Sequence, residues 1–123
     1  MDAFIAQYKW KKLIADSIGE KLKYYGYIYK KQGDNAYYYE NNYTEIRIVY
    51  YHKEIGINFK NKNKSIHSSD IINNCQKMIV EQVEQEDFEG IEEYFKTLLL
   101  IEFSNVEKCM PNVFYGDFSY WLH

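Results

Sequence analysis

The sequence predicts a single α+β domain with an N-terminal helix, a four-stranded antiparallel meander, and two C-terminal helices packed on one face of the sheet. Apolar residues recur with helical spacing at both ends of the chain and with a period of two between them. Short polar turns join the middle runs, which makes antiparallel pairing of neighbours the natural arrangement. A chain of 123 residues can build one hydrophobic core but is too short for two ordinary domains, so we treat residues 1–123 as one domain.

The segment from Asp2 to Tyr25 is expected to form the N-terminal helix. Its apolar stripe follows 3.6-residue spacing and consists of Phe4, Ile14, Ala15, Ile18, Leu22 and Tyr25. Lys11 interrupts this stripe, and we expect it to lie at an edge where its charge reaches water. Gly26 can adopt the left-handed conformation that ends many helices.

Four runs with alternating side chains follow, and each is expected to be a strand. They are Tyr27–Lys31, Ala36–Glu40, Thr44–Tyr51 and Glu54–Asn61. In the third run Ile46, Ile48 and Tyr50 occupy alternate positions, so one face of the sheet should lie on the core. The 14 tyrosines suit such a half-buried surface, since the ring packs and the hydroxyl reaches water.

Two helices are expected after the sheet. Residues 60–69 form a polar link, at the end of which Ser68, Ser69 or Asp70 can cap the first of these helices. Its apolar stripe is Ile72, Cys75, Ile79 and Val83. A break near Asp87 precedes the last helix, with Asp87 as its cap. That helix carries a broad apolar arc of Phe88, Ile91, Tyr94, Phe95, Leu98, Leu99, Ile101 and Val106.

Pro111 is expected to end regular structure and to leave an aromatic C-terminal tail. The aromatic residues of this tail are Phe114, Tyr115, Phe118, Tyr120 and Trp121. A disordered end would not carry so many, so we expect the tail to pack back over the sheet or the helices. The alternative is an exposed aromatic surface on which Tyr115 and Trp121 anchor a partner.

The composition favours a cytoplasmic protein that does not enter a membrane. No stretch approaches the roughly 18 apolar residues of a membrane span, and the start of the chain lacks the hydrophobic block of a signal peptide. Cys75 and Cys109 lie far apart and outside any C-x-x-C spacing. We therefore expect two reduced, mostly buried thiols.

Charge is distributed unevenly along the chain. Residues 1–64 hold twelve of the 15 Lys and Arg, whereas residues 65–123 hold eleven of the 18 Asp and Glu, within a formal net charge of −3. The 13 residues from Glu81 to Glu93 contain seven carboxylates and no Lys or Arg. These acidic residues are Glu81, Glu84, Glu86, Asp87, Glu89, Glu92 and Glu93. Concentrated charge of one sign attracts partners of the opposite sign.

This acidic stretch has two interpretations. It can be a solvated helix face, on which Asp87 and Glu89 favour a helix start and Glu92 pairs with Lys96. It can also be a patch that binds a basic partner, whose association then slows as salt rises. The second interpretation accounts better for the scarcity of nearby cations. The partner-binding residues that it predicts are Glu81, Glu84, Asp87, Glu89, Glu92, Glu93, Tyr115 and Trp121.

A catalytic or metal site is not expected. His52 with Glu54, or His67 with Asp70, could supply acid–base catalysis, but both pairs fall in predicted turns or links. The chain has no G-x-S-x-G, P-loop, H-E-x-x-H or zinc-spaced Cys/His set. We therefore predict a protein that is not an enzyme and uses no cofactor.

Nucleic-acid binding is a weaker alternative. Tyrosines of the predicted sheet could stack on bases, and three lysines follow them. These residues are Tyr37, Tyr38, Tyr39, Tyr50, Tyr51, Lys60, Lys62 and Lys64. The overall acidity argues against a phosphate-binding face, so no direct nucleic-acid contact is expected.

One structural pair is also predicted. Glu102 interrupts the apolar arc of the last helix much as Lys11 interrupts that of the first. If the two helices pack together, Lys11 and Glu102 can form a buried or half-buried ion pair.

An acidic, single-domain α+β chain with this composition and no catalytic motif resembles the immunity proteins of bacterial toxin–immunity systems, such as contact-dependent growth inhibition. The resemblance covers the whole chain in style and rests on no diagnostic motif. It implies tight binding to a cognate toxin domain, in many cases a nuclease with a basic substrate-binding surface, which the acidic patch would cover. Two other classes stay open: an adaptor that binds a cellular protein and neutralises nothing, and a small RNA-binding protein that uses the Tyr-rich sheet.

Overall fold

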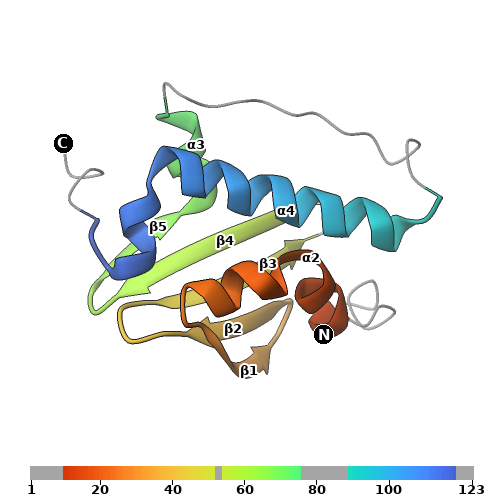
Figure 1. Ribbon diagram of the computed structural model, residues 1–123, viewed down its shortest axis with the longest axis horizontal. Coiled ribbons are helices and arrows are strands. Elements are labelled where there is room, and N and C mark those ends of the chain that lie inside the picture. The colour runs from red at the N-terminus through yellow and green to blue at the C-terminus, as the bar shows by residue number, and fades with distance from the viewer. Residues whose placement is uncertain (1–9, 52–53, 76–88, 119–123) are drawn as a thin grey trace.

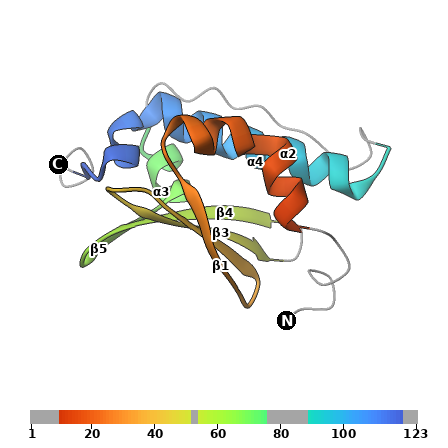
Figure 2. The same cartoon turned by 60° about the horizontal axis from the view of Figure 1, so that its bottom comes forward.

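The computed structural model describes residues 10–51, 54–75 and 89–118 (Figure 1). These residues form a five-stranded antiparallel sheet whose strand order follows the chain, β1-β2-β3-β4-β5. The helices lie together on one face of the sheet, as Figure 2 shows. The predicted α+β class is therefore confirmed, and so is the placement of the helices.

The strands are β1 (Ile28–Gly33), β2 (Ala36–Glu40), β3 (Glu45–Tyr51), β4 (Glu54–Asn61) and β5 (Lys64–His67). The helices are α2 (Trp10–Tyr24), α3 (Ser68–Asn73), α4 (Ile91–Cys109) and the 3₁₀ helix η2 (Pro111–Tyr115). The four predicted strands match β1 to β4 within two residues at each end, because alternation and short turns are strong local signals.

The fifth strand corrects the predicted four-stranded meander. Strand β5 lies inside the segment that the sequence suggests to be a polar link, and it pairs with β4 through a tight turn at Lys62, whose φ is +56°. Ile66 is opposite Phe59 and only 3% exposed. The single apolar residue of this run gives no visible alternation, so the edge of β4 rather than local sequence defines the strand.

The core lies between the sheet and the helices. On β3, Ile46, Ile48 and Tyr50 face inward as predicted, and all three are buried. On α2 the buried residues are Trp10, Leu13, Ile14, Ile18 and Leu22, whereas Ala15 is exposed. The expected stripe is thus rotated toward Trp10, whose ring stacks on Tyr50 with centroids 3.6 Å apart.

The predicted Lys11–Glu102 ion pair is wrong. Lys11 is exposed at the edge of α2, as expected for a misfit in the stripe, and its Nζ lies 4.0 Å from the centroid of the Tyr29 ring. The ion pair that joins the two helices lies two to three turns further along α2, where Lys21 Nζ is 2.6 Å from Glu107 Oε1. Tyr25 donates a 2.7 Å hydrogen bond to the other oxygen of Glu107.

The described part of the aromatic tail, up to Phe118, packs back on the domain as expected. Phe114 and Phe118 are buried, and Phe114 stacks on Tyr25 with ring centroids 4.1 Å apart. Pro111 does not end regular structure but begins η2, since a proline is tolerated in the first turn of a helix. Tyr120 and Trp121 lie outside the described residues.

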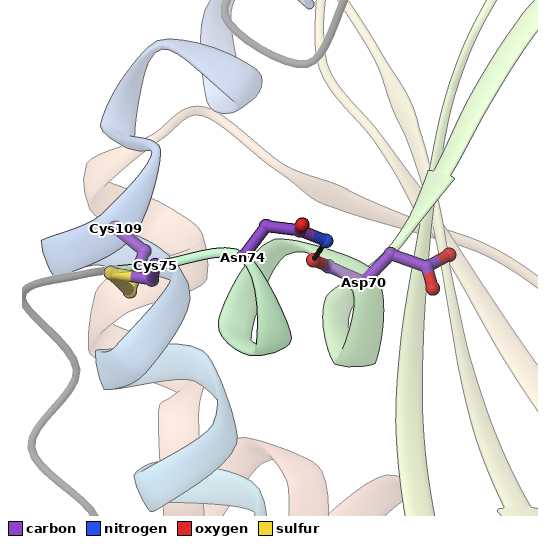
Figure 3. Close-up of a disulfide and its surroundings, with 4 residues drawn as sticks. All are labelled: Asp70, Asn74, Cys75 and Cys109. Atoms are coloured by element: carbon purple, nitrogen blue, oxygen red, sulfur yellow. Dashed lines mark hydrogen bonds between the residues drawn. A yellow bond between two sulfur atoms is a disulfide. The ribbon is translucent and has the colours of Figure 1, made fainter.

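A disulfide joins Cys75, just after α3, to Cys109 at the end of α4, with a Cα–Cα distance of 5.5 Å (Figure 3). In Figure 3 the Asn74 side chain donates to the carbonyl oxygen of Asp70, which fastens the end of α3 next to this bond. The expectation of reduced thiols is therefore wrong. A separation of 34 residues carries no local signal, and the pairing follows from the packing of α3 on α4.

The disulfide bears on the expected cytoplasmic location, because such bonds persist mainly in oxidising compartments. Within the described residues, no helix has the length and apolar character needed to cross a membrane.

We expect reduction of the disulfide to lower the free energy of unfolding by roughly 3 to 4 kcal/mol, since it closes a loop of 34 residues in the unfolded chain. Denaturant unfolding with and without a thiol-free reductant measures this difference. The Cys75→Ser/Cys109→Ser variant should be as unstable as the reduced chain and insensitive to reductant. Two freely titrating thiols in the untreated native protein would contradict the assignment.

A buried hydroxyl generates the second prediction. Tyr50 is 1% exposed and its hydroxyl has no hydrogen-bond partner in the described structure. Tyr50→Phe should therefore raise the free energy of unfolding by about 1 kcal/mol, because a buried donor without a partner is removed.

Tyr27→Phe is the matched control for Tyr50→Phe. The Tyr27 hydroxyl is hydrogen-bonded to the buried hydroxyl of Thr44, so its loss should destabilise by about 1 kcal/mol. Equal destabilisation by the two variants in urea unfolding would show that the Tyr50 hydroxyl is satisfied.

Candidate functional site

The described part of the acidic stretch lies at the start of α4. Glu89, Glu92 and Glu93 are all exposed, and the last two belong to the first helical turn, where carboxylates complement the helix dipole. Gly90 occupies the N-cap position of α4 and has no side chain to cap it. The prediction that Asp87 caps this helix is therefore wrong. Glu81, Glu84, Glu86 and Asp87 lie outside the described residues.

One cation neutralises part of this surface. Lys96 pairs with Glu93 at 2.6 Å, one helical turn away, and not with Glu92 as the sequence suggests. The hydrogen bond to Glu93 raises the pKa of Lys96. In the described structure, Glu89 and Glu92 have no Lys, Arg or His within ion-pairing distance. These two exposed carboxylates therefore form no ion pair with any residue of the described ranges.

Those predicted partner-binding residues that the structure describes do not form one surface. Tyr115 is 51% exposed, but it lies in η2, beyond the opposite end of α4 from Glu92. A helix of this length spans about 27 Å between its first and last residues. Tyr115 instead packs edge-on against Tyr43, with ring centroids 5.7 Å apart. Trp121 lies outside the described residues.

His67 and Asp70, which were considered as a possible acid–base pair, do not interact in this way. His67 is the N-cap of α3, and its Nδ1 accepts a 3.1 Å hydrogen bond from the backbone N–H of Ser69. It therefore takes the cap role expected of Ser68, Ser69 or Asp70. The Asp70 side chain is exposed and does not contact His67 through a hydrogen bond or ion pair. His52 lies outside the described residues.

Most of the tyrosines considered for base stacking are not available on the sheet surface. Tyr37, Tyr39 and Tyr50 are buried on the face that the helices cover. Burial raises the pKa of all three hydroxyls, so these groups stay neutral. Tyr38 lies on the open face, with Lys31 Nζ 4.9 Å from its ring centroid. The side chain of Tyr51 is not described.

A cleft of about 510 Å³ lies between α4 and the β4–β5 side of the sheet. Its walls include Tyr94, Leu98, Ile101, Glu102 and Asn105 from α4, faced by His67. Apolar residues from both the helix and the sheet line this cleft, and Glu102, Asn105 and His67 line it as well. A concave, largely apolar site with a few convergent polar groups is where small groups bind in most proteins.

Glu102 is the partly buried carboxylate of this cleft. Its Oε2 accepts a 2.8 Å hydrogen bond from Ser68 Oγ, which in turn accepts a 3.0 Å hydrogen bond from the backbone N–H of Ile57. Burial raises the pKa of Glu102, while the Ser68 hydrogen bond and the charge of His67 partly oppose this change. In the described structure, no cation lies within ion-pairing distance of Glu102.

The position of His67 depends on a glycine. A Cβ atom at Gly56 would lie 2.6 Å from Nε2 of His67, so only glycine lets the imidazole pack against β4 at this point. The ring is held in turn by the hydrogen bonds between Nδ1 and Ser69. The close approach of the His67 ring to the Gly56 backbone thus fixes this part of the cleft lining.

The sequence indicates that Glu102 is a charged residue within an apolar arc, but the predicted partner, Lys11, is wrong. In the structure Glu102 bonds to Ser68 instead. One sequence signal could have indicated the cleft. Glu102 and Asn105 are three residues apart, which places a carboxylate and an amide on the same side of a helix. The pairing of β5 with β4, which brings His67 to the cleft, could not be predicted from the residues of β5 alone.

The chain matches no protein-family model, no curated protein and no solved structure. Its function must therefore be argued from its own residues. Over the described ranges, no three His, Cys, Asp or Glu side chains are arranged to hold a metal ion.

The raised pKa of Glu102 predicts a pH-dependent difference between the wild type and Glu102→Gln. The folded chain keeps this proton over a pH window in which the unfolded chain has lost it, so wild-type stability falls as pH rises through that window. Glutamine keeps an acceptor for Ser68 and has no charge to bury. The variant should therefore gain stability relative to the wild type as pH increases from acid to neutral.

Urea unfolding across this pH range measures the effect, with Glu92→Gln as the exposed control. Parallel pH profiles for the wild type and Glu102→Gln would show that Glu102 titrates alike in the folded and unfolded chain.

Proposed function

We propose that this protein binds a basic partner protein and neutralises it by covering its functional surface, as immunity proteins do with their cognate toxins. The observation that carries the proposal is the start of α4, where Glu89 and Glu92 are exposed and lack a cation within the described chain. Carboxylates that are not neutralised internally leave their charge available to a partner.

The mechanism is stoichiometric inhibition. Long-range attraction between the carboxylates of α4 and the Lys or Arg of a cleft speeds capture, and close charge pairs then set which partner binds. A nuclease fits this description, because its substrate-binding surface must be basic to hold phosphates. Occupying such a surface blocks the substrate and requires no catalysis by the inhibitor, no cofactor and no direct contact with nucleic acid.

The attachment of α4 to the rest of the domain supports this role. Helix α4 is fastened to α2 by the Lys21–Glu107 pair and to the end of α3 by the Cys75–Cys109 disulfide. A surface that is already ordered before binding loses less conformational entropy when a partner docks.

The redox state of Cys75 and Cys109 bears on the compartment in which the protein meets its partner. A cytoplasmic encounter, which the composition favours, requires a chain that works with Cys75 and Cys109 reduced, because cytosolic thiol buffers reduce most disulfides. The disulfide favours an oxidising compartment instead. Expression of the chain with and without a secretion signal, scored by growth when the adjacent upstream gene is induced, separates these two locations.

An adaptor that binds a cellular protein without inhibiting it is the second candidate. The exposed rings of Tyr43 and Tyr115, which pack edge-on, favour it, since tyrosine is an effective anchor at interfaces. An adaptor would give no rescue in the growth assay. RNA binding loses its main support because Tyr37, Tyr39 and Tyr50 are buried.

Charge reversal tests the proposal. The Glu89→Lys/Glu92→Lys variant should bind the product of the upstream gene at least about tenfold more weakly than the wild type, mainly through slower association, and should fail to rescue growth. Raising salt should weaken the wild-type complex more than that of the variant.

The matched control is Glu20→Lys/Asp70→Lys, which changes the net charge equally at exposed positions on α2 and α3. If both double variants lose the same affinity, net charge rather than the start of α4 drives binding. If neither loses affinity, the acidic surface has no part in the interaction.

A further inference from the structure

The cleft beside α4 holds polar groups whose bonding capacity is not used by the residues that the structure describes. Glu102 is a carboxylate with two oxygens, and among those residues it accepts one hydrogen bond, from Ser68 Oγ. A carboxylate that is partly removed from water is stabilised most by a charged donor, which a hydroxyl does not supply. The cleft therefore has an excess of acceptor capacity at Glu102.

Asn105 is a second residue of the cleft whose hydrogen-bonding capacity is not used by the described residues. It lines the cleft and is only 9% exposed, yet its side chain forms no hydrogen bond within the described structure. Its amide atoms are not among the fully buried atoms that lack a partner, so they remain accessible from solvent. An accessible amide without a partner in the chain that is described, next to a carboxylate, can bond to a group that enters the cleft.

The remaining wall of the cleft suits an alkyl chain. Tyr94, Leu98 and Ile101 form an apolar strip along α4 that leads to Glu102. Glu54 also lines the cleft, as an exposed carboxylate without an ion-pair partner in the described structure. Two carboxylates, Glu54 and Glu102, favour a cationic ligand over a phosphate or carboxylate, although His67 lines the same cleft.

We propose that the cleft receives one arginine side chain of the basic partner, with its guanidinium on Glu102 and Asn105 and its methylene stem along Tyr94, Leu98 and Ile101. This inference rests on the proposed function, whose partner is cationic. Arginine fits better than lysine because its planar group offers five donors in fixed directions and can serve two acceptors at once. The cleft is open on one side, as a socket for a side chain of another protein must be.

The socket can be tested on the isolated chain with butylguanidinium, which carries the arginine head group on an alkyl stem. Titration into ¹⁵N-labelled protein should shift the amide signals of Leu98, Glu102 and Asn105 and give a saturable dissociation constant. Butylurea, which has the same shape without the charge, should bind at least about tenfold more weakly, because charge-assisted hydrogen bonds contribute most of the attraction.

Glu102→Gln separates a charge-dependent socket from an apolar groove. Glutamine retains the acceptor for Ser68, so the fold should persist, which circular dichroism checks. Butylguanidinium should bind this variant at least about tenfold more weakly than the wild type, whereas the control Glu20→Gln, at an exposed position on α2, should leave the affinity unchanged.

Three results would overturn the socket. They are equal binding of butylguanidinium and butylurea, equal binding to Glu102→Gln and the wild type, and shifts confined to Glu89, Glu92 and Glu93 or absent altogether. None of these depends on the partner. If the socket binds butylguanidinium but Glu89→Lys/Glu92→Lys leaves the partner complex intact, the role of the acidic surface fails while the socket stands.

Discussion

Helix α4 packs its apolar side against the sheet and α2, and this contact places every described carboxylate that is proposed to bind. Phe95, Leu99 and Phe103 are buried in the core, with at most 1% exposed. This packing fixes the direction of the other sides of the helix: Glu92 and Glu93 of its first turn face solvent, and Glu102 and Asn105 face the cleft. Burying three large apolar side chains contributes several kcal/mol, roughly 1.5 to 3 for each, which exceeds the cost of the partly buried carboxylate.

Bonds at two positions, Glu107 and Cys109, keep α4 from shifting along this packing. Lys21 and Tyr25 of the N-terminal part hold both oxygens of Glu107, and the disulfide holds Cys109 two residues later. Both attachments lie near the C-terminal end of α4. The acidic start of the helix is left available for a partner, and the cleft lies between the fixed end and that start. Structural and binding roles are thus separated along one element.

The sequence predicts those parts of the fold that follow from local periodicity. Strands β1 to β4 and the two long helices could be placed because alternation and 3.6-residue spacing are visible in their own residues. Strand β5 and the disulfide could not, since each depends on a surface that another part of the chain provides: the edge of β4 for Ile66, and the end of α4 for Cys75. The candidate site divides in the same way. The exposed carboxylates were found from charge alone, whereas the cleft required the tertiary arrangement of α4 and His67.

Carboxyl footprinting by mass spectrometry, on the free chain and on its complex with the upstream gene product, tests the docking of a cationic protein on α4 most directly. The account predicts that Glu89, Glu92 and Glu102 lose reactivity in the complex, while Glu20 and Asp70 react as in the free chain. Unchanged reactivity of the α4 carboxylates, with protection elsewhere on the surface, would contradict it.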